Sequence, residues 1–467
     1  MNKPLPALSV LAAAALLGAC GVLQPRLPAA DPGIAERWPL APVADASRVD
    51  PGADATAVAD IGWRDFFVDP QLGSLIGLAL DNNRDLRVAI LEIERARAQY
   101  GIQRADRLPS IGVAASLTRS RASDDLYAAN LRLTEFELDL FGRVASLSDA
   151  ALERYLATVE ARRSTQLALI AEVAGTWLAL AADQQQQRIA QATLENYEAV
   201  YRLTEQRHAL GAVSALDVAQ TRTIVEGARS DAARFTGLVA QDRNALALLV
   251  GARFDPALLP TAFAPQVSGV QALPAGVPSE VLLRRPDVLA AEHLLRAANA
   301  DIGAARAAFF PSIRLTAASG SASSDLDSLF DGGTGTWSFL PRIDLPIFKG
   351  GRLRAALGVA TASRDIALAQ YERAIQAGFR EVADALALSV TIAEQRYAQE
   401  ALLQAALRAH ELSAARYKAG QDSYLVFLDA QRTLFSARLS LVAIQQREQV
   451  NRVQLFKALG GGWLEQS

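Results

Sequence analysis

Apolar and polar residues alternate along two parts of this chain with a period of two. Around residues 110–140, Ile111, Val113 and Leu117 alternate with small or polar residues. This period predicts β-strands with one apolar face and one polar face. The pattern returns later in the chain. We expect two strand pairs, at about 110–121 with 127–140 and at about 312–322 with 335–345, joined by polar, exposed loops at 119–127 and 320–335.

The alternation changes phase inside the second predicted strand. Leu131 and Leu133 fall on one parity, whereas Phe136, Leu138 and Leu140 fall on the other. A slip of one residue turns every following side chain to the opposite face. The change of phase therefore predicts a β-bulge, or a change of environment, between the two groups.

Long stretches without helix breakers follow each strand pair. Residues 145–209 contain no proline and one glycine, and residues 352–418 contain no proline and two glycines. At about 1.5 Å per residue, each stretch predicts a helix on the order of 100 Å long. The spacing of Ile375, Phe379, Val382 and Leu386 is typical of a coiled coil, although an ordinary helical bundle would use the same stripes.

Each long helix is expected to end in a tight turn and to reverse. Gly211 and Gly420 stand where a helix C-terminus favours a left-handed residue. Ser214 and Ser423 stand where the next helix favours an N-cap. Asp217 follows Ser214 by three residues, as in a capping box. These turns predict the tips of two helical hairpins.

The whole order of elements is duplicated. Pro109-Ser110-Ile111 recurs as Pro311-Ser312-Ile313, at an offset of 202 residues. Gly211 with Ser214 recurs as Gly420 with Ser423, at an offset of 209. A repeat of this length indicates one structural unit used twice.

Composition excludes several classes of function. The 467 residues carry a net charge of −3, so no basic surplus indicates binding of nucleic acid. The three histidines, His208, His293 and His410, are scattered and lack metal-ligand spacing. We therefore expect no enzyme activity, no metal site and no cofactor other than a covalent lipid.

The lipid is predicted at Cys20, the only cysteine. A basic start and an apolar run from Leu5 to Leu17 precede it, which is typical of a signal peptide, although a buried helix shares these features. Leu17-Gly18-Ala19-Cys20 resembles a bacterial lipobox. The resemblance implies cleavage before Cys20, diacylglycerol on its sulfur and a third acyl chain on its new amine. Several acyl chains give durable membrane attachment, and Gly21 is compatible with the outer membrane.

The predicted strands are long enough, when tilted, to cross the hydrocarbon layer of a membrane. Open sheet edges cannot face lipid. Four strands are too few to close a barrel, for which about eight is the practical minimum. Several chains must then share one barrel: two would fill its interior, and three would leave a lumen. A soluble antiparallel sheet packed on the helices is the alternative.

Four segments resemble the outer-membrane factors of tripartite efflux pumps, and the resemblance as a whole covers nearly all of the mature chain. They are Glu137–Arg143, Ile343–Leu353, Gly420–Gln431 and Lys457–Trp463. The resemblance is closest to the OprM-type (NodT family) outer-membrane lipoproteins, relatives of TolC. It implies a mainly α-helical, internally duplicated fold with a membrane β-barrel portion. In this fold three chains share a twelve-stranded barrel and a long periplasmic α-helical barrel.

The resemblance also implies the partners. A homotrimer in the outer membrane of a Gram-negative bacterium would receive substrate from an inner-membrane pump of the resistance-nodulation-division type. A periplasmic adaptor would connect the two and contact the hairpin tips at Gly211, Ser214, Gly420 and Ser423. The expected segments are a signal peptide at 1–19, a lipid-anchored extended segment at 20–68, repeat 1 at 69–251, an equatorial linker at 252–280, repeat 2 at 281–460 and a tail at 461–467.

A periplasmic gate is implied on the helix after the second tip. Leu425, Asp429 and Arg432 lie at i, i+4 and i+7, along one side of that helix. By resemblance, Leu425 forms an apolar ring, Asp429 an acidic ring, and Arg432 belongs to the polar network that latches it. Val426 stands where TolC has a second Asp. Taken singly, such charges would also fit a solvated helix face.

Two other functions remain open. The same architecture would suit a duct for protein secretion or metal-ion efflux. A structural envelope lipoprotein would explain the anchor and the long helices, but not the amphipathic strand pairs. The substrate is not identified by the sequence.

Overall fold

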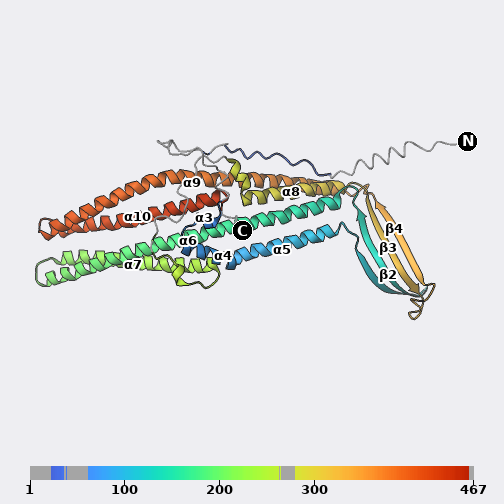
Figure 1. The fold of residues 1–467 in the computed structure, drawn as a ribbon, viewed down its shortest axis with the longest axis horizontal. Helices are drawn as coiled ribbons and strands as arrows, with labels where there is room; N and C mark the ends of the chain where they lie inside the picture. Colours follow the sequence, from blue (N-terminus) through green and yellow to red (C-terminus); the bar gives the residue numbers. More distant parts are fainter. Residues whose placement is uncertain are drawn as a thin grey trace. The chain divides into compact units, whose positions relative to one another are not determined.

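The computed structural model describes residues 23–35, 38, 61–121, 123–261, 263 and 279–461 (Figure 1). The predicted signal peptide and Cys20 lie outside these residues, as do most of the linker and the end of the tail. The chain divides into two compact units, each assembled from three stretches of sequence. Unit 1 comprises Met1–Pro32, Ile90–Ala161 and Asp287–Ala374, and unit 2 comprises Gly33–Ala89, Arg162–Pro286 and Ile375–Ser467.

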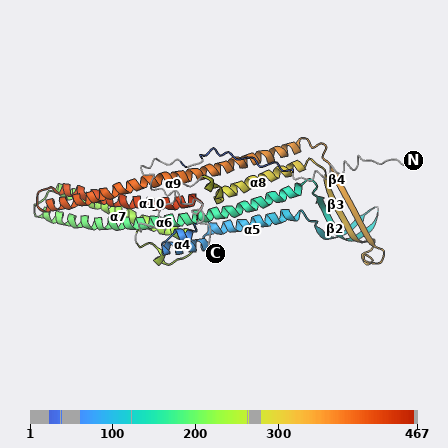
Figure 2. The same cartoon turned by 45° about the horizontal axis from the view of Figure 1, so that its top comes forward.

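Unit 1 contains one four-stranded antiparallel sheet with the order β1-β2-β3-β4. The strands lie side by side in Figures 1 and 2. The β1–β2 and β3–β4 connections leave the sheet at one end. The connections between strands and helices leave it at the other end. The strands are β1 (Ile111–Ser120), β2 (Ser123–Leu138), β3 (Ser312–Ser323) and β4 (Gly335–Asp344).

The predicted loop at 119–127 is wrong. β2 begins at Ser123 and pairs back to β1, with Ser120 opposite Ser123. The Arg119 guanidinium donates to both carboxylate oxygens of Asp125, one of them at 2.9 Å. This ion pair neutralises the Asp125 carboxylate, which was predicted to lie in an exposed loop. Strand pairing therefore continues almost to the turn.

The predicted bulge is confirmed in β2. The register to β3 shifts between Leu133 and Phe136, and Glu135 has a positive φ of 41°. Leu133 lies opposite Ala317 before the shift, and Phe136 lies opposite Leu315 after it. Because the partners of both keep the same parity on β3, the bulge returns the apolar side chains of β2 to one face of the sheet.

Helices connect directly to the sheet in unit 1. α5 (Arg84–Ala105) leads to β1, and α8 (Pro286–Ala307) leads to β3. Two longer helices, α6 (Arg143–Ala209) and α9 (Arg352–Lys418), begin after β2 and β4. Each of the two contains 67 residues, in agreement with the absence of proline from both stretches.

Unit 2 contains two helical hairpins. α6 turns back into α7 (Ala215–Val250), and α9 turns back into α10 (Tyr424–Ala458), so that each pair runs side by side in Figures 1 and 2. The shorter elements of this unit are α3 (Trp63–Phe66), α4 (Pro70–Asn82), η2 (Pro256–Leu258) and η3 (Ser279–Arg284).

Aromatic side chains hold the short helices in the core of unit 2. Phe66 of α3 stacks on Phe456 of α10, with ring centroids 3.9 Å apart. Trp63 and Trp177 are each almost fully buried beside them. Burial of a large apolar side chain contributes roughly 1.5–3 kcal/mol, so this cluster fixes the segment just before repeat 1 against the end of repeat 2.

The duplication extends to individual hydrogen bonds. The Asn83 amide donates to the Leu249 carbonyl oxygen at 2.8 Å. The Arg285 guanidinium donates to the Ala458 carbonyl oxygen at 2.6 Å. These residues are separated by the offsets of 202 and 209 that the sequence repeats carry. Each repeat therefore ties the end of its returning helix to the residue before its own connecting helix.

Candidate functional site

The first hairpin tip has the predicted geometry. Gly211 has a left-handed φ of 71°, which glycine adopts without a Cβ penalty. The Ser214 hydroxyl accepts from the Asp217 backbone N–H at 3.1 Å, and the Asp217 carboxylate accepts from the Ser214 backbone N–H at 2.9 Å. The capping box is thus confirmed, and hydrogen bonds from Ser214 hold the pKa of Asp217 below its ordinary value.

The second tip uses a different device. Gly420 has the same φ of 71°, and Ser423 stands at the predicted N-cap position, but its side chain makes no capping hydrogen bond. The Asp422 carboxylate instead accepts from Arg416 at 2.6 and 2.8 Å. This bidentate pair lowers the pKa of Asp422 and closes the turn with a charged contact.

The three predicted gate residues lie together on one exposed side of α10. Leu425 is 62% exposed, and Asp429 and Arg432 are also exposed. The Asp429 backbone oxygen accepts from Thr433 at 2.9 Å. Within the described part of one chain, neither charged side chain of this pair forms an ion pair. Both charges are therefore available to groups outside the single chain.

Asp429 and Arg432 line a cavity of about 730 Å³ between the two hairpins. Tyr197 of α6 and Ile224 and Asp231 of α7 line its other side. The positive charge of Arg432 acts on Tyr197, although burial dominates and raises the pKa of that phenol. The gate residues thus belong to a groove shared by four helices, α6, α7, α9 and α10.

Sequence reasoning missed a contact that joins the two hairpins near their tips. Arg207 of α6 donates to the Tyr417 hydroxyl of α9 at 3.2 Å. Arg207 and Arg416 are equivalent in the duplication, but Val213 replaces the acidic Asp422 in the first copy. Because no carboxylate stands at the position equivalent to Asp422, Arg207 reaches the other hairpin. A comparison of the two tips position by position is the signal that would have found it.

Aromatic rings surround this contact. Tyr417 stacks on Phe427, with centroids 5.6 Å apart and ring planes 1° from parallel. Tyr424 lies 5.3 Å from Tyr417, and its hydroxyl is buried without a hydrogen-bond partner. Burial and the neighbouring phenols raise the pKa of Tyr424 strongly. The base of the second tip is therefore a compact aromatic cluster.

A pair of carboxyl groups lies inside the first hairpin. Burial, and then the charge of Asp183, raises the pKa of Asp242 to about 6. Burial is also the first cause of the raised pKa of Asp183, partly offset by the hydrogen bond with Asp242 and then by the charge of Arg234. Two carboxylates at one site favour sharing a proton.

The histidines do not form a site. His208 contacts the Val213 carbonyl oxygen at 2.9 Å, His293 contacts Glu153 at 2.6 Å, and His410 packs beside Phe427. Among the residues that the structure describes, no group of three or more potential metal ligands occurs.

The sheet has one apolar and one small or polar face. On β4, Trp337 is 81% and Ile343 is 67% exposed, and both belong to the apolar face. β1 and β4 are the sheet's outer strands, so each has an unpaired edge within the described part of one chain. Among the described helices, only α6 has a stretch long and apolar enough to cross a membrane, and 67% of that stretch is buried in the protein, as in a core helix.

The sequence of both repeats matches a known protein family, and the chain is similar to known proteins over its whole length. A family described as "Outer membrane efflux protein" matches residues 75–252 and 277–461, ranges that fall on the two repeats. "Antibiotic efflux pump outer membrane protein ArpC" of Pseudomonas putida is 47% identical, over 100% of this chain and 97% of its own. "Outer membrane protein OprJ" of Pseudomonas aeruginosa is 45% identical, over 100% and 98%.

A solved structure shows the same fold. The open state of the MtrE outer membrane channel of Neisseria gonorrhoeae superposes with a TM-score of 0.84 at 37% identity, over 94% of this chain and 98% of that one. The mainly helical, internally duplicated architecture with a small antiparallel sheet is therefore that of the TolC-like channels.

Proposed function

The chain belongs to the outer membrane efflux protein family, and from that premise we propose that three copies of it form the exit duct of a tripartite efflux pump. The duct passes drugs or other small molecules across the outer membrane. It performs no chemistry and needs no metal or cofactor. The observation that carries the proposal is a four-stranded sheet with an apolar face and two open edges.

The open edges support a shared barrel. β1 and β4 run antiparallel to each other, because the sheet is antiparallel throughout and has an even number of strands. The β4 of one copy can therefore pair antiparallel with the β1 of the next. Lipid excludes open edges, and about eight strands are the minimum for a closed barrel. Three copies supply twelve strands and leave room for a lumen.

The hairpins supply the periplasmic part of the proposed duct. Helices of 67 residues reach on the order of 100 Å, which can carry a tunnel well away from the membrane. Leu210 is 85% and Leu216 is 65% exposed at the first tip. These side chains beside Gly211 and Ser214, and the exposed Val426 near Gly420 and Ser423, suit contact with a periplasmic adaptor, which links the duct to an inner-membrane pump of the resistance-nodulation-division type.

The gate is the second part of the proposal. Asp429 and Arg432 are exposed and form no ion pair within the described part of one chain. Threefold symmetry brings three copies of each toward one axis. Carboxylates of Asp429 then form an acidic ring beside an apolar ring of Leu425, and Arg432 can pair across the copies. Such pairs hold the closed state until the adaptor rearranges the tips.

A lipid anchor on Cys20 fits the contacts of the segment that follows it. Leu23 accepts from Arg306 at 3.3 Å, and Pro25 accepts from the Asn299 amide at 2.8 Å, both through backbone oxygens. Arg306 lies near the end of α8, just before β3. Three residues reach at most about 10 Å. Acyl chains on Cys20 would thus enter the membrane close to the helix-connected end of the sheet.

Planar-bilayer conductance of the purified protein tests the proposal. We expect discrete channels, and we expect Asp429→Ala with Arg432→Ala to raise the open fraction because the latch is lost. Arg408→Ala with Glu411→Ala is the matched control, since it removes one acid and one arginine three residues apart on exposed α9 positions. Absence of channels from the unchanged protein would refute the duct and indicate a structural lipoprotein. Equal open fractions in both double variants would remove these residues from the gate.

A further inference from the structure

The connection between β4 and α9 exposes two large apolar side chains. Ile347 is 92% and Phe348 is 88% exposed, the two highest values among large apolar residues in the described part of the chain. Leu345 in the same connection is 56% exposed. Neighbouring apolar side chains left in water mark a surface that contacts something else.

The apolar alternation of β4 continues in the sequence beyond the end of the strand. Phe339, Pro341 and Ile343 alternate along β4 and lie opposite Ala317, Leu315 and Ile313 of β3. Leu345 and Ile347 keep the same parity in the sequence after the strand has ended. The connection leaves the sheet at the end where the helices attach, because β4 is followed directly by α9.

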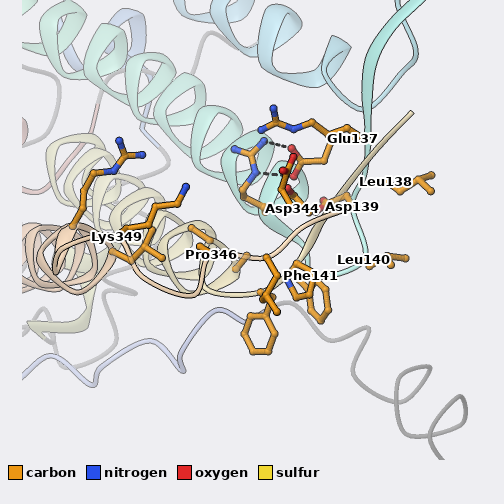
Figure 3. A pocket seen from close by; sticks show the side chains of 18 residues that line it. Glu137, Leu138, Asp139, Leu140, Phe141, Asp344, Pro346 and Lys349 are labelled. Atoms are coloured by element: carbon orange, nitrogen blue, oxygen red, sulfur yellow. Dashed lines mark hydrogen bonds and ion pairs between the residues drawn. The ribbon is translucent and has the colours of Figure 1, made fainter. Parts of the chain in front are cut away.

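Two unpaired cations follow the apolar residues. Lys349 and Arg352 are exposed, and neither forms an ion pair within the described part of the chain. They line a cavity of about 560 Å³ with three carboxylates, and Figure 3 shows the Lys349 side chain well apart from Glu137.

Each carboxylate of this cavity already has a partner other than Lys349 and Arg352. Glu137 accepts from Arg143 at 2.7 and 2.8 Å, and Asp139 accepts from the Ala145 backbone N–H at 2.6 Å. Asp344 accepts from Arg342 at 3.1 Å. The positive charges of Lys349 and Arg352 are therefore left for an external anion.

We propose that residues 345–352 form a docking surface for anionic phospholipid of the inner leaflet of the outer membrane. Ile347 and Phe348 lie among the acyl chains, and Lys349 and Arg352 lie at the phosphates. Burial of apolar area and attraction to anionic headgroups act together in such surfaces. The proposal rests on the proposed function, since it requires the sheet to span that membrane. The helix-connected end then faces the periplasm, where the leaflet is phospholipid rather than lipopolysaccharide.

Fluorescence quenching by brominated lipids tests this surface. The full-length protein carrying Phe348→Trp in a Trp337→Phe background is reconstituted into vesicles of phosphatidylcholine with phosphatidylglycerol. Bromine is placed on one lipid or the other at equal mole fraction. We expect the new indole to be quenched more strongly when phosphatidylglycerol carries the bromine. Lys349→Gln and Arg352→Gln should each reduce that preference about fivefold, whereas Lys418→Gln, an exposed cation at the other end of α9, should leave it unchanged.

Quenching of Trp337 in the unchanged protein distinguishes failure of the docking surface from failure of the proposed function. If Trp337 is quenched but the indole from Phe348→Trp is not, the docking surface is refuted and the membrane-spanning sheet stands. Equal quenching by both brominated lipids, or a preference that survives both charge removals, also refutes the headgroup site. If neither indole is quenched, the proposed function itself fails.

Discussion

Replacement of Arg285 tests whether each repeat holds the end of its own returning helix independently of the other. Arg285 is 5% exposed and donates to the Ala458 carbonyl oxygen at 2.6 Å and to Glu381 at 2.8 Å. Its guanidinium also fills the space beside Gly378, where an added Cβ would lie 3.2 Å from its Nε. Arg285→Ala removes both hydrogen bonds and leaves a gap.

The magnitude follows from these contacts. An unsatisfied buried carbonyl costs about 1–3 kcal/mol. Loss of one partner of a fully buried ion pair costs about 3–5 kcal/mol, but Glu381 is 42% exposed and water can solvate it. We therefore expect the end of α10 to lose about 2–4 kcal/mol of local stability, or roughly 30- to 700-fold in its opening equilibrium.

Hydrogen exchange followed by mass spectrometry measures this opening. Peptides that cover residues 450–461 should exchange faster in Arg285→Ala, while peptides that cover 240–251 should not change. Asn83→Ala provides the mirrored control, because Asn83 donates to Leu249 in the first repeat. Arg285→Lys, which keeps the charge but loses the planar pair of donors, should be intermediate. Unchanged exchange at 450–461, or equal acceleration of both regions, would refute the reasoning.

Three further changes test other parts of the structure. In Gly303→Val, the added Cβ would meet the Gln24 side chain at 2.6 Å and Ser146 at 2.7 Å, so trypsin should cleave after Arg26 faster than in Gly358→Val, where nothing lies within 4 Å; equal cleavage would contradict a docked segment. The pKa of Asp242 is raised from 3.8 to about 6, so the native state binds the extra proton and stability falls as pH rises from about 4 to 6. Asp242→Asn should therefore raise the unfolding temperature more at pH 7 than at pH 4, and an equal shift at both would contradict the shared proton. Gly420→Ala places a Cβ at a φ of 71° and should destabilise the second tip by about 1 kcal/mol, seen as faster exchange at 419–423 that Gly227→Ala does not cause.

Local chemistry made much of the fold predictable. The bulge near Glu135 followed from a change of parity, and the left-handed glycines of both tips followed from the breakers Gly211 and Gly420. In each case one short stretch of sequence contained the whole signal. The strands lie within four residues of the expected ranges for the same reason.

Contacts between distant residues were not predictable in this way. The turn after β1 was misjudged because the Arg119–Asp125 pair bridges two strands. The approach of Asp183 to Asp242 depends on the register of two antiparallel helices, which periodicity does not set. The exchange of a serine cap for the Arg416–Asp422 pair likewise depends on side-chain reach across a turn. The roles of Leu425, Asp429 and Arg432 rest on resemblance and on their shared exposed side of α10.

The mass of the intact assembly tests the central claim most directly. The claim is that four strands per chain cannot close a barrel alone, and that three chains share one barrel with room for a lumen. Native mass spectrometry of the membrane-extracted protein should give three times the mass of one processed, lipid-bearing chain. A stable monomer or dimer as the only membrane-inserted form would contradict the shared barrel, and with it the duct.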